Sequence, residues 1–356
     1  MQPFGGIPDS RTASLKSCII TVLIGLGGAF LFSFIGLPVP WFTGPLFFTS
    51  FAGVFKLKIY SFSFLNTPAL IVIGLIIGSS IPPNLAELAQ KWWISLAAIF
   101  IITACTTFLT AVLQKTLFGS DAVTAVLASL PGALSMVVSL ANEHKADVTK
   151  VTLFQSLRLI FLLVFLTSAL HLYGMSPERK DFQFTGGNPF SLLWLLGIFV
   201  FITLLSFKKI IARGSLCMSL AMILSAVCYF TELVNIPPPD MLNRAALFCI
   251  GIIFGSRLNR IPIREVFPYI LQSALSIILL LAVCAGLTYV FAMLGNFNYL
   301  TLFLACFPGA FELATAIAVD FNADPFFVGF HHTARIVFII LLTPYIIKYL
   351  PKADGK

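Results

Sequence analysis

The sequence predicts an all-helical membrane protein made of two inverted repeats, each with five transmembrane helices and one re-entrant or broken Pro-Gly segment. Composition is the first observation behind this prediction. Of the 356 residues, 59% are hydrophobic and 10% are charged, and the mean hydropathy is +1.00. A soluble core could not bury so much apolar surface, so we expect a chain that crosses a bilayer many times. The other two observations are an internal repeat and the placement of the basic residues.

Each half of the chain contains six apolar segments, most of them long enough to cross a bilayer as a helix. In the first half they cover residues 17–36, 38–56, 65–81, 92–114, 121–141 and 148–172, and in the second half residues 189–207, 214–231, 243–257, 265–294, 299–319 and 325–349. The first segment follows Arg11 and Lys16, as the apolar part of a signal peptide would. It is long for a signal peptide and leads directly into the next segment, so we expect it to remain as the first helix.

The second and third segments carry prolines and glycines with separate expected roles. The stretch LPVPWFTGP, residues 37–45, opens the second segment, and we expect a helix entry there, with a binding site as the alternative. The third segments contain GLIIG at 74–78 and GIIFG at 251–255. Two glycines four residues apart allow two helices to approach closely, so we predict packing surfaces.

The chain repeats itself at a spacing of 177 residues. The aligned pairs include Pro131 with Pro308, Gly132 with Gly309, Ala133 with Ala310, Asp147 with Asp324, and Arg158 with Arg335. The third segments align at the same spacing without a gap. A proline, a glycine, an aspartate and an arginine that all agree at one offset indicate a tandem duplication.

The fifth segment of each half is expected to break at its Pro-Gly pair, Pro131 and Gly132 in one half and Pro308 and Gly309 in the other. Proline removes a backbone donor, and glycine permits backbone conformations that a helix cannot hold. Free backbone groups inside a membrane must be buried in protein or face water. Inverted repeats would bring the two tips together near the middle of the membrane, where many secondary transporters bind substrate. The alternative is a kink that only shapes packing.

The sixth segments each carry a polar stripe well inside the membrane. Arg158 and Arg335 lie too far along their helices to reach the interface, and Gln155 and His332 precede them by three residues on the same helix face. A buried guanidinium is costly without partners, so each must face the protein interior or a water-filled cavity. Two roles stay open: holding the free carbonyls of the broken helix, or direct contact with an anionic substrate.

Three acidic residues accompany these motifs. Glu312 follows Pro308 by four residues, whereas its counterpart in the first half is Ser135. Glu312 is a candidate for proton coupling or for pairing with an arginine. Asp147 and Asp324 open the sixth segments, and Pro325 follows Asp324, so both aspartates are expected to cap helix N-termini.

The basic residues favour inverted halves. If the Pro-Gly segments enter and leave on the same side, the inner side holds 16 lysines and arginines and the outer side 4, in agreement with the positive-inside rule. If all six segments crossed, the halves would be parallel and the basic groups at 208–213 and 257–264 would lie outside. The expected layout is a cytoplasmic N-terminal segment at 1–16, a first membrane repeat at 17–173, an extracytoplasmic connector at 174–188, a second repeat at 189–350 and a tail at 351–356. Both termini are then cytoplasmic.

Other classes of function find little support. All seven cysteines lie in apolar segments, and the four histidines are not at metal-ligand spacing. The net charge of +8 comes from residues scattered in short loops, so topology explains it better than nucleic acid does. We therefore expect no enzyme, no metal, no cofactor and no direct nucleic-acid partner.

With LPVPWFTGP, the two Pro-Gly-Ala segments and the Ala-Asp and Arg that follow each, the chain resembles the AbrB-type integral membrane family. The resemblance covers about residues 18–350. Family members often have Pro-Gly-Gly where this chain has Pro-Gly-Ala. They are labelled regulators, ammonia monooxygenases or transporters, so the resemblance implies no settled substrate, and any effect on gene expression would be indirect.

The interpretation that fits best is a multi-pass inner-membrane protein that acts as a secondary transporter of a small solute. The two buried arginines favour an anion. The candidate binding residues are Pro131, Gly132, Ser135, Gln155, Arg158, Pro308, Gly309, Glu312, His332 and Arg335. The alternative is a membrane regulator or scaffold that transports nothing, and the sequence is compatible with a homo-oligomer.

Overall fold

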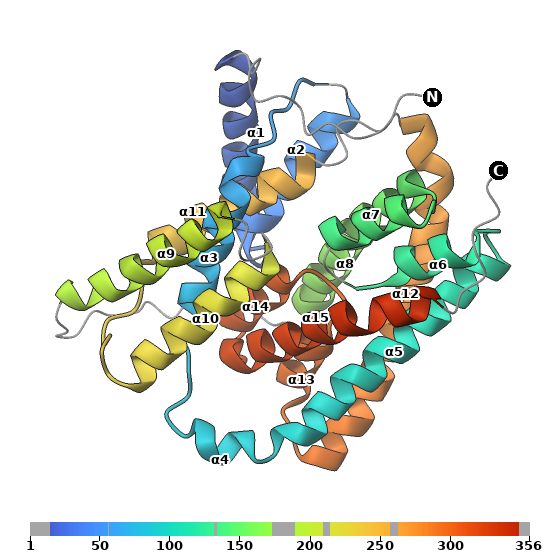
Figure 1. Cartoon of the computed structure of the whole chain (residues 1–356). Coiled ribbons are helices and arrows are strands. Elements are labelled where there is room, and N and C mark those ends of the chain that lie inside the picture. The colour runs from blue at the N-terminus through green and yellow to red at the C-terminus, as the bar shows by residue number, and fades with distance from the viewer. Residues whose placement is uncertain are drawn as a thin grey trace.

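The computed structural model describes residues 15–55, 57–131, 134–172, 189–208, 214–256 and 263–348, and the regular structure in them is helical (Figure 1). The helices of the first half are α1 (Leu15–Ile35), α2 (Pro40–Val54), α3 (Asn66–Gly78), α4 (Leu85–Ala89), α5 (Trp92–Thr116), α6 (Ala122–Ser129), α7 (Leu134–Glu143) and α8 (Val148–Leu172). Those of the second half are α9 (Leu192–Phe207), α10 (Ser215–Phe230), α11 (Asp240–Gly255), α12 (Ile263–Gly295), α13 (Tyr299–Cys306), α14 (Phe311–Asp320) and α15 (Pro325–Lys348).

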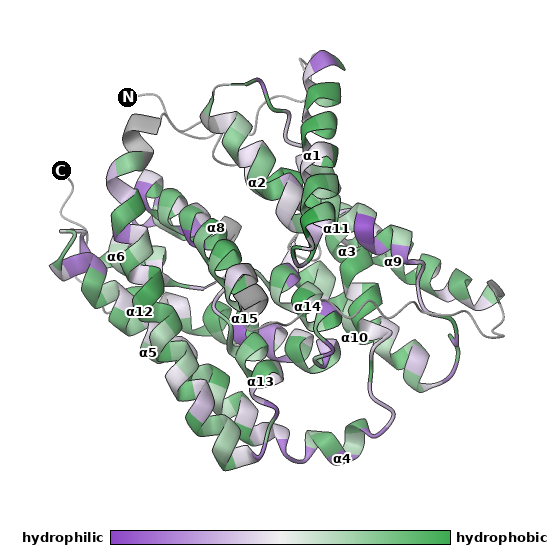
Figure 2. Ribbon diagram, turned by 180° about the vertical axis from the view of Figure 1, so that it is seen from behind, coloured by the Kyte–Doolittle hydropathy of each residue, from purple (hydrophilic) through white to green (hydrophobic). Residues whose placement is uncertain are grey.

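Five of these helices, α1, α5, α8, α12 and α15, are long and apolar enough to cross a membrane. The shorter helices α9 and α10 are apolar as well. Hydrophilic residues gather mainly at helix ends and in connecting segments, while the helix bodies are apolar (Figure 2). Large apolar side chains are exposed along α1, α5, α9 and α12. Exposing this much apolar surface to water is unfavourable, whereas contact with lipid is not. These helices are compatible with a multi-pass membrane protein.

The twelve expected segments all appear as helices. Both fifth segments are broken, so that α6 and α7 meet at Pro131, and α13 and α14 meet at Pro308. The short helix α4 was not expected from the sequence. The connector at 174–188, the tail at 351–356 and all of the N-terminal segment except its last two residues, which begin α1, lie outside the described residues.

Helices of the two halves pack against each other in a reciprocal way. Helix α3 of the first half lies against α10 of the second, and α11 of the second lies against α2 of the first. The glycine pairs lie in these contacts, as predicted. A Cβ on Gly74 would lie 2.3 Å from the carbonyl oxygen of Met218, and one on Gly78 would lie 2.4 Å from that of Met222. The contacting residue numbers rise together along the two helices, so α3 and α10 run in the same direction.

The helices form two groups (Figure 1). We call α1–α3 and α9–α11 the glycine bundle, and α5–α8 and α12–α15 the arginine bundle, because each packs mainly within itself. Helices α14 and α15 contact the glycine bundle through α3 and α10. In addition, the backbone N–H of Val39, at the start of α2, donates to Oδ2 of Asp320 at 2.9 Å. The corresponding helices of the first half, α7 and α8, have no comparable packing against α2 and α11 within the described residues. The two bundles therefore meet mostly on one side.

Candidate functional site

The broken helices begin and end for the same local reasons in both halves. Asp121 caps α6 by accepting a hydrogen bond from the Thr124 N–H at 2.9 Å, and Asn298 caps α13 by accepting from the Thr301 N–H at 3.0 Å. These caps were not singled out in the sequence, although they align at the 177-residue offset. Each helix ends two residues before its proline, and the residue in between has an extended backbone, which a following proline favours. The predicted helix breaks are thus confirmed.

Arg158 extends from α8 to the end of α6. Its Nη1 donates to the carbonyl oxygen of Ser129 at 3.2 Å, and its Nη2 donates to that of Leu130 at 3.0 Å. These carbonyls belong to the last turn of α6, where no helical N–H can reach them. Gln155 receives a third bond, from Nη2 to its Oε1 at 2.7 Å. The guanidinium therefore closes the C-terminal end of the broken helix.

Arg335 on α15 makes the corresponding hydrogen bonds at the end of α13. Its Nη1 donates to the carbonyl oxygen of Phe307 at 2.6 Å, and its Nη2 lies 3.4 Å from that of Gly309. The Nη2 also lies 2.8 Å from Nδ1 of His332. Of the two roles left open for the arginines, the structure shows the first: both donate to free carbonyls of the broken helices.

Gln155 and His332 perform equivalent tasks with different side chains. The Nε2 of Gln155 donates to the Leu127 carbonyl at 3.2 Å, and the Nε2 of His332 lies 2.9 Å from the Leu304 carbonyl. Each side chain also offers an acceptor to its arginine. His332 can donate through Nε2 and accept through Nδ1 only as the neutral tautomer with its proton on Nε2. The predicted polar stripes are therefore hydrogen-bonded connectors between two helices.

The two guanidinium groups have no carboxylate partner within the described residues. Arg158 is 6% exposed and Arg335 is 2% exposed, and the ion pair formed by described residues is Arg244 with Asp240. The C-terminal ends of α6 and α13 carry partial negative charge, which offsets part of each positive charge. Both guanidinium groups therefore depend on hydrogen bonds to uncharged groups rather than on ion pairs with described residues.

The expected capping aspartates are confirmed. Asp147 accepts from the Lys150 N–H at 3.0 Å, and Asp324 accepts from the Phe327 N–H at 2.9 Å. Burial raises the pKa of the Asp324 carboxyl, and amide hydrogen bonds oppose that effect in part.

The remaining predicted residues lie around the tips of the broken helices. Pro131, Pro308 and Gly309 are buried there. Glu312 is 5% exposed on the first turn of α14, where the positive end of the helix favours an acid. Gly132 and the side chain of Ser135 lie outside the described part of the chain. Nothing in the structure tests the binding role assigned to this set.

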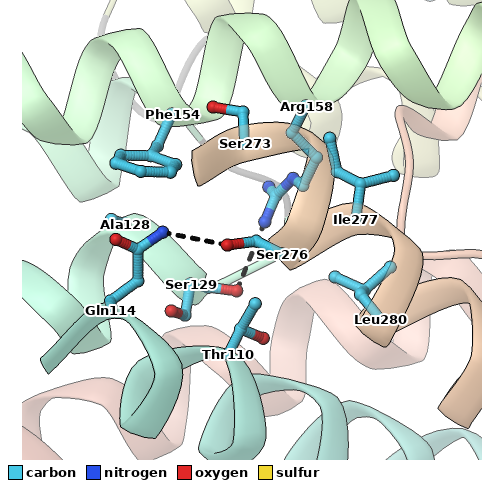
Figure 3. A pocket seen from close by; sticks show the side chains of 10 residues that line it. All are labelled: Thr110, Gln114, Ala128, Ser129, Phe154, Arg158, Ser273, Ser276, Ile277 and Leu280. Carbon is cyan, nitrogen blue, oxygen red and sulfur yellow. Dashed lines mark hydrogen bonds between the residues drawn. The ribbon is translucent and has the colours of Figure 1, made fainter. Parts of the chain in front are cut away.

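A small cavity lies beside Arg158, between α5, α6, α8 and α12 (Figure 3). Its volume is about 20 Å³. The polar lining residues are Thr110, Gln114, Ser129, Arg158, Ser273 and Ser276, and the apolar ones are Ala128, Phe154, Ile277 and Leu280. The ends of Arg158, Gln114 and Ser276 come together in the view, and Nε2 of Gln114 donates to Oγ of Ser276 at 3.3 Å.

Sequence reasoning missed every residue of this cavity except Arg158. The sequence does contain one signal for them: at the 177-residue offset, polar residues align with apolar ones, Gln114 with Phe291 and Ser276 with Ile99. As for metals, no group of three or more His, Cys, Asp or Glu side chains within the described ranges is arranged to hold an ion.

Comparison with known proteins identifies the family. The family model described as "Transition state regulatory protein AbrB" matches residues 41–351, which include both broken helices and both arginines. A relative from Escherichia coli (strain K12), named "Putative regulator AbrB", is 26% identical over 340 residues, or 94% of this chain and 95% of the relative. No solved structure matches the chain. The chain belongs to the AbrB family.

Proposed function

We propose that this protein is a secondary transporter of a small solute in the inner membrane, with two inverted repeats and both termini in the cytoplasm. The observation that carries the proposal is the pair of broken helices whose free carbonyls are held by buried arginines. Broken helices with polar groups deep in the membrane are the structures in which secondary transporters hold substrate and coupling ion. A protein that only needed to sit in a membrane would gain nothing from burying two unpaired cations.

The order of contacts along the helices supports re-entrant segments. Thr124, near the start of α6, accepts from the Asp147 N–H at the start of α8 at 2.9 Å. Leu130, at the end of α6, contacts Arg158 further along α8. Since α6 and α8 begin at the same end and run in the same direction, the chain must return through α7. Each half then crosses the membrane five times, because α6 and α7 together do not cross.

The direction of α3 and α10 supports inversion of the halves. Helix α3 is the third segment of the first half, and α10 is the second segment of the second half. In parallel halves the second and third segments would run in opposite directions, because successive crossings alternate. In inverted halves they run in the same direction, as α3 and α10 do. The distribution of basic residues favours the same layout.

Movement between the two bundles would give alternating access. The bundles pack closely where α14 and α15 meet α3 and α10, and much less where α7 and α8 face α2 and α11. In a pseudo-symmetric molecule, rocking one bundle against the other can open the closed side and close the open side. Such unequal packing of the bundles is typical of a transporter whose binding site is open to one side of the membrane.

The alternative is a membrane regulator or scaffold that transports nothing. The names of the family and of the relative favour this alternative. We expect no enzymatic activity, and we expect any effect on gene expression to be indirect. A regulator needs a fixed or signalling conformation, whereas a transporter must move between two. The two functions therefore differ in whether the bundles have to separate.

A cross-link between the bundles tests this difference. The hydroxyls of Ser219 on α10 and Thr333 on α15 are 2.9 Å apart, so Ser219→Cys with Thr333→Cys should form a disulfide in a chain whose native cysteines are replaced. Uptake of radiolabelled chloride, formate, acetate and phosphate is then measured in proteoliposomes. A transporter loses uptake on oxidation and recovers it on reduction, and the two single-cysteine variants are unaffected. No uptake by the reduced protein would favour the regulator.

A further inference from the structure

The cavity beside Arg158 contains polar atoms that no protein group satisfies. The unpartnered atoms are Nε of Arg158, Oε1 of Gln114 and Oγ of Ser273. All three side chains line the cavity, and Gln114 is 2% exposed and Ser273 1% exposed. Buried polar groups in proteins nearly always have partners, and a cluster of three without them points to a bound water or ion.

The positions that align with this polar lining at the 177-residue offset carry apolar side chains. At the 177-residue offset, the polar residues Thr110, Gln114, Ser129, Ser273 and Ser276 correspond to Leu287, Phe291, Cys306, Leu96 and Ile99. Ile99 and Cys306 are buried in the main apolar core, and Leu287 and Phe291 pack against it. The arginine is present in both halves, so the cavity is not needed to hold the broken helix. The polar lining accompanies Arg158, whereas the aligned positions are apolar.

The charges around the cavity favour an anion over water. Arg158 forms no ion pair with any described residue. The Nε–H of Arg158 and the hydroxyls of Ser273 and Ser276 can all donate toward the cavity. A half turn of the Gln114 amide, which exchanges its oxygen and nitrogen, would turn the amide nitrogen toward the cavity in place of the oxygen, and the Ser276 hydroxyl would then donate to Oε1 instead of into the cavity. In either orientation, three donors and a cation without a carboxylate partner are a suitable environment for a negative charge.

We propose that this cavity is a binding site for a small monovalent anion of about the size of chloride. A volume of about 20 Å³ holds one water molecule or an ion of similar size, and it excludes a larger solute unless the helices move. The transporter proposed above would then have a small anion as its substrate, and this part of the inference rests on the proposed function. Binding itself does not require transport, so the two can fail separately.

Equilibrium binding of radiolabelled chloride to the purified full-length protein in detergent tests the site. The cavity variants are Ser276→Ile and Gln114→Phe, which introduce the residues found at the aligned positions of the other half, Ile99 and Phe291. Ser276→Ala removes the hydroxyl without adding volume and covers the case in which the larger residues disturb folding. Thr203→Val is the matched control, because the Thr203 hydroxyl on α9 bonds only to its own helix, at Phe199. Gel filtration and circular dichroism verify the fold of each variant.

We expect saturable binding of one chloride per chain, weakened at least tenfold in the cavity variants and unchanged in Thr203→Val. A cavity that holds only water would give no saturable binding to the unmodified protein, and this result would overturn the proposal. Unchanged binding in folded Ser276→Ile and Gln114→Phe would overturn it as well. Binding without uptake of any solute into proteoliposomes would retain the site and remove the transporter. Uptake that persists in both cavity variants would retain the transporter and remove the site as its substrate site.

Discussion

Replacing His332 tests whether a hydrogen-bonded connector holds the second broken helix in place. His332 accepts a bond from Arg335 at 2.8 Å and donates one to the Leu304 carbonyl at 2.9 Å. Leucine at this position removes both bonds and leaves a buried guanidinium and a buried carbonyl with fewer partners. A bond to a charged group contributes about 1.5–3 kcal/mol and a neutral bond about 0.5–1.5 kcal/mol. We therefore expect His332→Leu to lower the free energy of unfolding by about 2–4 kcal/mol, with the lower end favoured inside a membrane.

His332→Gln is the matched control, because the first half uses Gln155 for the same task. Glutamine offers one donor and one acceptor, so it should preserve stability to within about 1 kcal/mol, the scale of one neutral hydrogen bond. Equilibrium unfolding in mixed micelles, followed by circular dichroism, gives the free energies of the three proteins. If leucine were as stable as histidine, or if glutamine cost as much as leucine, the connector role would be refuted.

Three further changes examine other parts of the fold. Gly78→Leu places a side chain where even a Cβ would lie 2.4 Å from the Met222 carbonyl, so we expect the α3–α10 contact to separate and thermal stability to fall, whereas substitution at Gly197, with nothing near its Cβ, should be tolerated. Asp121→Ala removes the cap of α6 and should cost about 1 kcal/mol in the same unfolding assay, and an unchanged value would mean that Arg158 alone holds that helix. Gly186→Cys, in a chain free of native cysteines, should react with an impermeant thiol reagent in intact cells, and protection from it would contradict the inverted layout.

The helices and their breaks could be predicted from sequence because their causes are local. Apolar length determines which segments can span a bilayer, and a proline followed by a glycine, as at Pro131 and Pro308, disfavours a continuous helix. The capping roles of Asp147 and Asp324 follow from their position before an apolar helix. None of these inferences needs knowledge of a distant part of the chain.

The arginine contacts and the cavity could not be predicted because they depend on which helices meet. Arg158 has the same sequence surroundings whether it binds a solute or the carbonyls of Ser129 and Leu130, and only the approach of α6 decides between them. Gln114 near the end of an apolar helix resembles a residue at the membrane interface. Its importance becomes visible when Ser276, 162 residues away in the chain, lies within hydrogen-bond distance of it.

The reciprocal glycine packing has a consequence for the origin of the protein. Helix α3 finds its close partner in α10, and α11 finds its partner in α2, so each half would be left with an unmatched glycine face if it stood alone. In the inverted layout proposed above, the ancestor that preceded the gene duplication would have associated as two identical chains. The matched helices run in the same direction although they hold successive places in their repeats, so those two chains would have been inserted into the membrane in opposite orientations. Fusion of the two copies would then have allowed each one to change separately, so that the cavity lining keeps Gln114 and Ser276 while the aligned positions carry Phe291 and Ile99.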